Sequence, residues 1–463
     1  MSYASVNPYT GEVMKTYLTA TDQEVQSAIS AADQAFQTWK TTSYETRAKV
    51  LSNTAAILRD RHTQYAKLLT LEMGKLLSEA EAEVELSAEI LDYYAKNGAS
   101  MLQPRNLSVG GLKDDAVQLI YQPLGVLYIV EPWNFPYYQI VRVGAPQLMA
   151  GNTLLLKHAS NVPQAAAAFE ALFLEAGLPK HTFINLYAAH EQNELILSDS
   201  RVCGVALTGS EQAGAVVASI AGKYLKKSTL ELGGSDVFIV LEDADIDKAV
   251  DWAVFGRHWN AGQVCVSSKR IVLVDAIYDE FLEKYKVGVR KLKAGDPFDP
   301  STTLAPLSSQ AAVDLLKSQI QQAITDGACA ETLGEPVPSQ GAFYQPTILT
   351  NITKNNAAYY TEMFGPVSQI YHVADEAAAI RLANDSPFGL GGSVFTENID
   401  RGRHVAKQIN TGMVYINHPT GVKADIPFGG IKRSGYGHEL IDLGLHEFVN
   451  IKVIANIPIQ DGF

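Results

Sequence analysis

Hydrophobic positions in the first hundred residues recur at the spacing of an α-helix. Val25, Ile29, Ala32, Phe36 and Trp39 lie 4, 3, 4 and 3 positions apart, which places them on one helix face. The sequence TDQE just before this face fits a capping box, in which a threonine and a glutamate satisfy free N–H groups of the first turn. Residues 44–96 continue in the same style with few glycines and no proline. We therefore expect packing helices throughout this region.

After about residue 103 the pattern changes to short apolar runs that alternate with helical stretches. Residues 107–126 predict a β-hairpin around Gly110-Gly111, because β-favouring segments flank a glycine turn. Continuous apolar strands that alternate with helices are typical of a parallel, doubly wound α/β sheet, which binds ligands at the carboxyl ends of its strands. The first alternation contains expected strands at 126–130, 153–157, 183–187 and 202–209 and expected helices at 137–149, 163–176 and 191–198.

A second alternation of the same kind begins near residue 236. The chain then closes with an extended segment at 447–457, in which apolar and polar residues alternate. This segment fits either an edge strand of its own domain or a strand that adds to the sheet of another subunit. The second alternation contains expected strands at 236–241, 269–274, 345–350, 368–373 and 392–396 and expected helices at 278–292, 375–384 and 399–408.

The composition supports large buried cores and narrows the range of partners. Hydrophobic residues make up 47% of the 463 residues and charged residues 19%, which argues against disorder. The net charge of −13 repels phosphate backbones and anionic lipids, so we expect no nucleic-acid and no membrane binding. No apolar run of 18 residues and no leader-like segment is visible, so the sequence predicts a cytoplasmic protein.

Cys203, Cys265 and Cys329 are too few and too widely spaced for a disulfide framework or a CxxC site. They predict a reducing compartment with room for one reactive thiol, and we expect no metal site. Cys203 is expected in a strand and Cys329 at a helix end, and both positions fit inert thiols. Cys265, in NAGQVCVSSKR, lies among small and polar residues in a predicted loop, the accessible setting that a thiolate nucleophile needs. Taken alone, it fits a buried inert cysteine better.

Two further motifs carry groups that catalysis uses. Glu231 in LELGGSD follows an apolar strand and precedes a glycine pair, where a carboxylate with a raised pKa serves as a general base. Asn134 in EPWNFP follows a buried strand, where a carboxamide donates to a developing oxyanion. The simpler alternatives are a strand-end glutamate before a turn and a turn-capping asparagine.

Three glycine-rich loops complete the set. LTGSEQAG places Gly209 and Ser210 between a strand and a helix, where phosphate approaches a helix N-terminus, but it is neither GxGxxG nor a P-loop. EMFGPV holds Glu362 and Phe364, and PFGGIKRSGYG holds Phe428. By themselves these loops predict only turns.

The motifs and their order resemble the NAD(P)-dependent aldehyde dehydrogenase superfamily. The similarity extends from NPYTGEV at residues 7–13 to the final β segment, through six separate motifs. Within the superfamily the sequence is most similar to bacterial succinate-semialdehyde dehydrogenases. The residues that carry the resemblance are Asn134, Lys157, Gly209, Glu231, Cys265, Glu362 and Phe428.

The resemblance implies a thioester mechanism. The Cys265 thiolate attacks the aldehyde, while the Asn134 side chain and the Cys265 backbone N–H hold the oxyanion. Hydride then passes to a nicotinamide, and Glu231 activates the water that hydrolyses the thioester.

The resemblance also implies a set of cofactor-binding residues. Many NAD-preferring members have a glutamate three residues after the lysine that matches Lys157, and here that position is Ser160. Since serine does not repel a 2′-phosphate, and Lys157 and His158 would attract one, we expect NADP to be preferred over NAD. The cofactor residues implied are Trp133, Lys157, Ser160, Gly209, Ser210, Glu362 and Phe364.

The substrate implied is a small anionic aldehyde, succinic semialdehyde. Arg142, eight residues after Asn134, matches an arginine that binds the distal carboxylate in similar enzymes, and Tyr138 is expected beside it. A second family arginine is replaced by Trp259, with Arg257, His258 and Lys423 as possible substitutes. Trp259 and the tyrosines favour the alternative of a broad aldehyde dehydrogenase for aliphatic or aromatic aldehydes.

Two other classes fit less well. A CoA-acylating dehydrogenase of the same fold typically lacks a base such as Glu231, and a structural or binding protein has no need of Cys265, Glu231 and Asn134 together.

The resemblance implies a Rossmann-like cofactor domain, an α/β catalytic domain and a β bridging element for oligomerisation, in a homodimer or a dimer of dimers. We expect the cofactor domain at 1–105 and 124–231, the catalytic domain at 232–438 and the oligomerisation element at 106–123 and 439–463.

Overall fold

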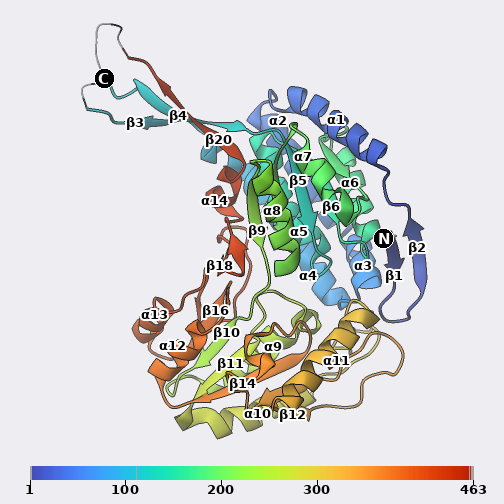
Figure 1. Cartoon of the computed structure of the whole chain (residues 1–463), viewed down its shortest axis with the longest axis vertical. Helices are drawn as coiled ribbons and strands as arrows, with labels where there is room; N and C mark the ends of the chain where they lie inside the picture. Colours follow the sequence, from blue (N-terminus) through green and yellow to red (C-terminus); the bar gives the residue numbers. More distant parts are fainter. Residues whose placement is uncertain (1–2, 111, 458, 460–463) are drawn as a thin grey trace.

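The computed structural model describes residues 3–110, 112–457 and 459. Figure 1 shows two lobes, each built on a sheet, and a β arm that projects from one of them. Both large sheets are mainly parallel and are flanked by helices, which confirms the predicted α/β fold class. No helix among the described residues is long and apolar enough to cross a bilayer.

The N-terminal region is helical, as the periodicity predicts. A short hairpin of β1 (Tyr3–Val6) and β2 (Val13–Tyr17) precedes four helices. The five apolar residues of the first helix are its buried face, and Thr21 and Glu24 form the predicted capping box. The helices are α1 (Asp22–Trp39), α2 (Tyr44–Asp60), α3 (His62–Met73) and α4 (Leu77–Met101).

The first large sheet has six strands in the order β19-β9-β8-β5-β6-β7. Five of them are parallel, and β19 pairs antiparallel with β9. The strands are β5 (Val126–Glu131), β6 (Thr153–His158), β7 (Phe183–Asn185), β8 (Val202–Thr208), β9 (Lys227–Glu231) and β19 (Gly435–Tyr436). The helices between them are α5 (Pro136–Ala150), α6 (Pro163–Glu175), η1 (His190–Gln192), α7 (Asn193–Ser198) and α8 (Glu211–Lys223).

The register of this sheet aligns the carboxyl ends of its strands. Glu131 pairs with His158, and Thr208 pairs with Glu231. Because Val130 pairs with Leu207, Glu131 also lies level with Thr208. Paired residues of parallel strands point to the same face of a sheet. These polar side chains therefore form one row on one face, at the carboxyl end of the sheet.

The second large sheet has seven strands in the order β12-β13-β14-β11-β10-β16-β17, of which only β12 is antiparallel. The strands are β10 (Val237–Val240), β11 (Arg270–Val274), β12 (Cys329–Thr332), β13 (Thr347–Thr350), β14 (Val367–Val373), β16 (Gly392–Phe395) and β17 (Tyr415–Ile416). The helices of this lobe are α9 (Ile246–His258), η2 (Trp259–Gly262), η3 (Asp275–Ile277), α10 (Tyr278–Arg290), α11 (Gln310–Thr325), η4 (Ala357–Tyr360), α12 (Glu376–Asn384) and α13 (Ile399–Ala406).

One expected position is wrong. Cys329 does not end a helix but begins the exposed strand β12. The preceding helix ends at Thr325, and Gly327, with φ of +99°, turns the chain into the strand. A short strand that follows a helix so closely carries too few residues to show its own period.

The arm consists of β3 (Arg105–Leu107), β4 (Val117–Pro123) and β20 (Val449–Ala455). Strand β20 pairs with β4 along the whole of both strands, so the tail is fixed to the predicted hairpin. Gly111 of that hairpin lies outside the described residues. The arm points away from both lobes in Figure 1. The remaining elements are β15 (Phe388–Gly389), β18 (Ile431–Lys432) and α14 (Ile441–His446).

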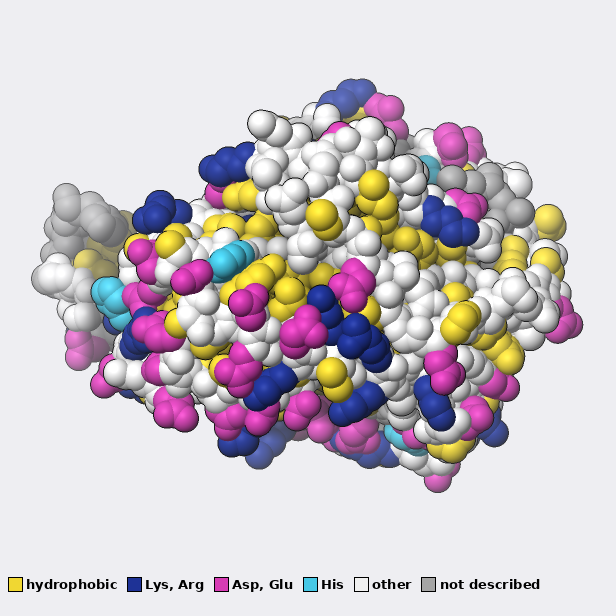
Figure 2. Space-filling model, turned by 90° about the horizontal axis from the view of Figure 1, so that it is seen from below, with side chains coloured by type: hydrophobic (Ala, Val, Ile, Leu, Met, Phe, Trp, Pro, Cys, Tyr) yellow, Lys and Arg dark blue, Asp and Glu magenta, His cyan; other side chains and the backbone are white. Residues whose placement is uncertain are grey.

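Surface charge is mixed on the face seen in Figure 2. Lysine and arginine side chains lie among aspartates and glutamates there, beside scattered hydrophobic side chains. The view is from below Figure 1, toward the lobe of the seven-stranded sheet.

We predict that Gly435→Ala destabilises the protein by at least about 2 kcal/mol. Gly435 has φ of +113° and pairs with Glu231, and a Cβ there would overlap the Leu230 carbonyl oxygen. Thermal unfolding of the variant measures the effect. Gly110→Ala is the control, because no atom of the described residues lies within 4 Å of its added Cβ, its chain neighbours aside. Equal melting temperatures for the two variants would contradict the prediction.

Candidate active site

Cys265 lies in the loop that joins η2 to β11. Element η2, just before this loop, contains three consecutive residues of positive φ, Asn260 (52°), Ala261 (54°) and Gly262 (75°), which turn the chain tightly. The buried Lys269 ammonium donates to the Val264 carbonyl at 2.7 Å and to the Cys265 carbonyl at 2.8 Å. These bonds fix the backbone that presents the thiol.

Two cavities meet at Cys265, since its side chain lines both. The first, which we call the aromatic cavity, has a volume of about 480 Å³, and the second, the glycine cavity, has a volume of about 360 Å³. The aromatic cavity is lined by Phe135, Tyr138, Arg142, Trp252, Phe255 and Trp259, among others. The glycine cavity is lined by Trp133, Asn134, Gly209, Ser210, Gly233, Glu362 and Phe364, among others. The thiol is thus accessible from two sides, as a nucleophile between two ligands needs to be.

The ionisation of Cys265 is disfavoured in this state. Burial raises the pKa of its thiol to about 12, while Arg142 and Lys269 oppose that rise and the Glu231 carboxylate adds to it. A thiol with this pKa is protonated at neutral pH, so attack requires a group that takes its proton.

Asn134 and Glu231, both predicted from sequence, differ in how they lie relative to Cys265. Asn134 lines a cavity together with Cys265, whereas Glu231 is buried near it. Asn134 lines the glycine cavity, and its Nδ2 donates to the Gln263 carbonyl at 3.0 Å, which orients the carboxamide and leaves one N–H free. Glu231 ends β9 and is 2% exposed, and it lines neither cavity. Its Oε1 lies 3.4 Å from where a Cβ on Gly429 would be, so the glycine leaves room for the carboxyl group.

The electrostatics of Glu231 depend on its burial. Burial raises its pKa well above the ordinary value, the neighbouring Glu439 raises it further, and Arg142 lowers it. Neither carboxylate oxygen has a hydrogen-bond partner among the described residues. The group is therefore suited to accept a proton.

Five of the predicted cofactor residues line the glycine cavity. Ser210 caps α8, since its side chain accepts from the Ala213 N–H at 3.2 Å. Glu362 accepts from the Gly234 N–H at 3.1 Å and forms an ion pair with Lys269 at 3.0 Å. Trp133 and Phe364 meet edge to face with ring centroids 5.8 Å apart. These contacts give the cavity a fixed wall of glycine, serine, carboxylate and aromatic groups.

Lys157 and Ser160 lie at and beyond the end of β6. Burial lowers the pKa of Lys157 to about 8, and its ammonium has no hydrogen bond or ion pair to any described residue. His158 does not add positive charge, contrary to expectation. Adjacent strand residues point to opposite faces, so His158 faces inward, where its Nε2 donates to the Pro136 carbonyl at 3.0 Å and burial lowers its pKa to about 4.

The predicted substrate residues divide into two groups. Tyr138, Arg142 and Trp259 line the aromatic cavity, whereas Lys423 is exposed and is not part of its lining. The possible substitutes Arg257 and His258 do not line the cavity either. The Arg257 guanidinium donates to the Met363 and Val367 carbonyls, and His258 Nδ1 donates to the Val254 carbonyl.

Arg142 is 1% exposed and already has several partners. Its Nη1 donates to the Tyr138 hydroxyl at 3.1 Å, its Nη2 donates to the Thr208 hydroxyl at 3.0 Å, and it forms an ion pair with Glu439. A guanidinium has five N–H groups, so two remain for a ligand.

Sequence reasoning missed Glu131 and Glu439. Glu131 ends β5 at 2% exposure, and Glu439 is 5% exposed. A carboxylate directly after the apolar run VLYIV was the available signal for Glu131, since the carboxyl ends of parallel strands collect functional groups. No local signal marks Glu439.

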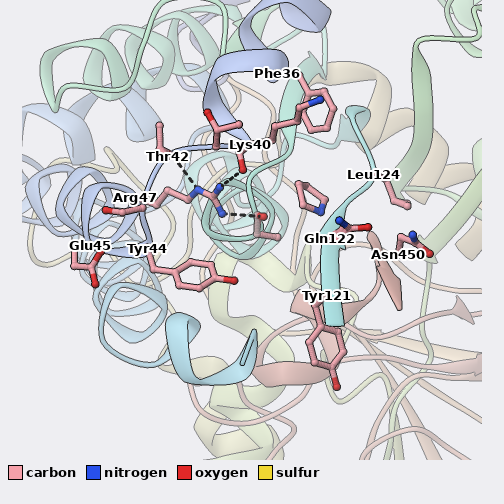
Figure 3. A pocket seen from close by; sticks show the side chains of 14 residues that line it. Phe36, Lys40, Thr42, Tyr44, Glu45, Arg47, Tyr121, Gln122, Leu124 and Asn450 are labelled. Atoms are coloured by element: carbon pink, nitrogen blue, oxygen red, sulfur yellow. Dashed lines mark hydrogen bonds between the residues drawn. The ribbon is translucent and has the colours of Figure 1, made fainter. Parts of the chain in front are cut away.

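A third cavity, of about 840 Å³, lies at the base of the arm, between the turn that joins α1 to α2 and strand β4 (Figure 3). Arg47 beside it is buried and donates to Thr42 at 3.0 Å and to the Lys40 carbonyl at 2.8 Å. None of the predicted catalytic, cofactor or substrate residues lines this cavity.

Comparisons with known proteins show the family. The model of the aldehyde dehydrogenase family matches residues 1–454. The succinate-semialdehyde dehydrogenase [NADP(+)] of Deinococcus radiodurans is 47% identical over 98% of this chain and 95% of its own length. The enzyme of that name from Mycobacterium leprae is 43% identical over 98% and 99%.

Among solved structures, succinic semialdehyde dehydrogenase from Streptococcus pyogenes in complex with NADP+ superposes with a TM-score of 0.96. It is 45% identical and the match covers 98% of this chain and 100% of that one. The family predicted from the motifs is confirmed: the chain belongs to the aldehyde dehydrogenase family.

Proposed function

We propose that the protein oxidises succinic semialdehyde to succinate with NADP+ through a thioester on Cys265. The observation that carries this proposal is the position of Cys265 where the aromatic cavity meets the glycine cavity. The relatives and the solved structure described above bear names with this substrate and cofactor.

The residues present fit NADP+. The unpartnered Lys157 ammonium and the Ser160 hydroxyl supply donors for an anionic ribose phosphate, and Gly209 opens the start of α8 to a pyrophosphate. Trp133, Glu362 and Phe364 would hold the nicotinamide end near Cys265.

In the first half of the reaction Cys265 gives its proton to a water molecule, which carries it to solvent, and the sulfur bonds to the aldehyde carbon. The free N–H of Asn134 and the Cys265 backbone N–H donate to the oxyanion. Each donor lowers the activation free energy by about 3 kcal/mol. NADP+, when bound, supplies the acceptor for the hydride whose loss turns this adduct into a thioester.

In the second half Glu231 turns from its buried position toward Cys265 and takes a proton from water. The hydroxide adds to the thioester carbon, the C–S bond breaks, and the Cys265 thiolate leaves. Aldehyde, NADP+ and water thereby give carboxylic acid, NADPH and one proton.

The substrate would lie in the aromatic cavity with its carboxylate on Arg142 and Tyr138. Arg142 has two N–H groups to spare, and the Tyr138 hydroxyl, which accepts from Arg142, retains its own hydrogen to donate. A second candidate function, oxidation of aliphatic or aromatic aldehydes, is favoured by the aromatic lining, which includes Phe135, Trp252 and Trp259.

Initial rates distinguish the two candidates. We expect succinic semialdehyde to have a higher kcat/KM than hexanal or benzaldehyde with NADP+, and Cys265→Ala to abolish all three activities. Arg142→Lys should raise KM for succinic semialdehyde at least about tenfold, because lysine keeps the charge that balances Glu439 but loses the forked N–H groups that would bind the carboxylate. KM for hexanal should stay the same. Equal effects on both aldehydes would remove Arg142 from substrate binding, and equal rates for all three aldehydes would favour the broad enzyme.

Cofactor choice is tested at Ser160. We predict that Ser160→Glu lowers kcat/KM for NADP+ at least about tenfold, since a carboxylate repels the 2′-phosphate. The value for NAD+ should not fall. Ser160→Gln, similar in size but neutral, is the matched control. A wild-type protein that prefers NAD+ would contradict the assignment outright.

We further propose the three-part division expected from sequence: a cofactor domain at 1–105 and 124–231, a catalytic domain at 232–438, and an oligomerisation element at 106–123 and 439–463. Strand β19 is an exception to this division, because residues 435–436 belong to the catalytic segment by number but pair with the sheet of the cofactor domain. Three free cysteines support a cytoplasmic location.

The arm supports a homodimer or a dimer of dimers. Ile451, Val453 and Ile454 of β20 are 53%, 58% and 48% exposed, which is unusual for neighbouring apolar residues of one strand. We predict that the double variant Ile451→Asp with Val453→Asp is a monomer by light scattering. Val287→Asp, an equally exposed apolar position on α10, should leave the assembly intact. An unchanged mass for the double variant would exclude this face of the arm from the interface.

A further inference from the structure

Four buried ionisable groups meet behind Cys265. Glu131 ends β5, Glu231 ends β9, Glu439 follows β19, and Arg142 lies on α5. They are 2%, 2%, 5% and 1% exposed, respectively. Three carboxyl groups thus share one guanidinium in a region without solvent.

The strand register brings Glu131 and Glu231 to one face of the sheet. Strand β8 lies between β5 and β9, and its last residue, Thr208, is level with both glutamates. Since neighbouring strands are about 4.8 Å apart, the two glutamate Cα atoms are separated by roughly 10 Å. Arg142 bonds to the Thr208 hydroxyl, so its guanidinium lies on the same face, above the middle of this row.

Arg142 does not neutralise all three carboxyl groups. Its ion pair goes to Glu439, and its other bonds go to Tyr138 and Thr208. No carboxylate oxygen of Glu131 or Glu231 has hydrogen-bond geometry with a described residue, although the Thr208 hydroxyl faces Glu131. With all three glutamates ionised the cluster would carry a net charge of about −2, which a buried site does not tolerate.

The cluster therefore retains protons, and its members titrate together. Burial raises the pKa of Glu131 well above the ordinary value, and Glu439 and Glu231 raise it further. Groups coupled in this way share their protons, so the charge state of one fixes that of the next.

We propose that Glu131 is a positioning residue for thioester hydrolysis: it shares a proton with Glu231 across Thr208, and its charge sets how readily Glu231 accepts the proton of the attacking water. This inference rests on the base role proposed above for Glu231. Glu131 thus offers a second buried site for the proton that Glu231 takes from water. The shared proton also keeps the net negative charge of the cluster small enough for Arg142 to balance.

Other charged groups face the cluster from every side. Lys227, which pairs with Glu447 at 3.0 Å, lies beyond Glu231 and Glu439. On the side of the thiol, the groups that act on Cys265 are Arg142, Lys269, Glu231 and Asp236. His158, level with Glu131, is neutral, and Tyr138 bonds to Arg142. None of these is a second cation in contact with Glu131.

The test is the pH profile of Glu131→Gln. While the shared proton is on Glu231, Glu131 is ionised, and its negative charge helps to hold that proton. Glutamine carries no such charge, so the substitution lowers the pKa of Glu231. The acid limb of the hydrolysis rate should therefore move to lower pH by about 0.5 to 1 unit. Glu72→Gln is the matched control, because Glu72 is also buried but caps α6 through the Gln164 and Ala165 N–H groups. Its profile should match that of the wild type.

A burst of NADPH in the first turnover separates this inference from the proposed function. A burst in Glu131→Gln with an unmoved acid limb would overturn the role of Glu131. NADPH formation that persists undiminished in Cys265→Ala would overturn the thioester mechanism instead.

Infrared difference spectra of wild type against Glu131→Asp provide a readout without turnover and without loss of the carboxyl group. We expect a protonated-carboxyl band at neutral pH that shifts in the variant. A spectrum without such a band would also overturn the proposal, even if Glu131→Gln fails to fold.

Discussion

The position of the nucleophile depends on one buried cation, Arg257. Its guanidinium is 0% exposed and lies where two loops of the active site approach each other. It donates to Ser267 Oγ at 2.6 Å in the loop of Cys265, and to the carbonyls of Met363 at 2.8 Å and Val367 at 2.7 Å around the loop of Phe364. Burial lowers the pKa of Arg257 to about 10, which still leaves the group charged at neutral pH.

No carboxylate of a described residue forms an ion pair with Arg257, so backbone carbonyls and the Ser267 hydroxyl compensate for its lost hydration. Separating the two loops would take one of these partners away from a buried charge, which costs free energy. The loops are therefore held together. Lys269 is a second buried cation that links two loops. Its ammonium donates to the Val264 and Cys265 carbonyls and forms an ion pair with Glu362. The thiol and the wall of the glycine cavity are thereby held as one unit.

Local sequence was sufficient to predict most helices and strands, whereas the candidate site residues came from the resemblance of several motifs, taken together, to one family. Helix faces such as that of α1, and buried strands such as β5 and β8, have a period that short windows reveal. Cys265 and Asn134 were found because each lies in a short, distinctive motif next to a strand. The roles of these residues remain predictions that activity measurements decide.

The remaining features, among them the partners of the buried charges and the face of the sheet to which a side chain points, depend on contacts between distant segments. No local pattern encodes such contacts. Glu439 reaches Arg142 from almost 300 positions away, and Arg257 was considered only as a substitute substrate cation because its carbonyl partners lie far along the chain. His158 was misjudged because the side of the sheet on which a residue lies is fixed only when neighbouring strands set the register.

The pairing of β19 with β9 has a consequence for synthesis of the chain. The edge of β9 is covered by residues 435–436, more than 200 positions later. While the chain is being made, β5 to β9 emerge early, but the backbone N–H and C=O groups on the outer side of β9 have no partner until nearly the last residues leave the ribosome. An open, apolar strand edge is a template for pairing with other chains. The first lobe thus has an aggregation-prone edge while about 200 of the 463 residues are added to the chain.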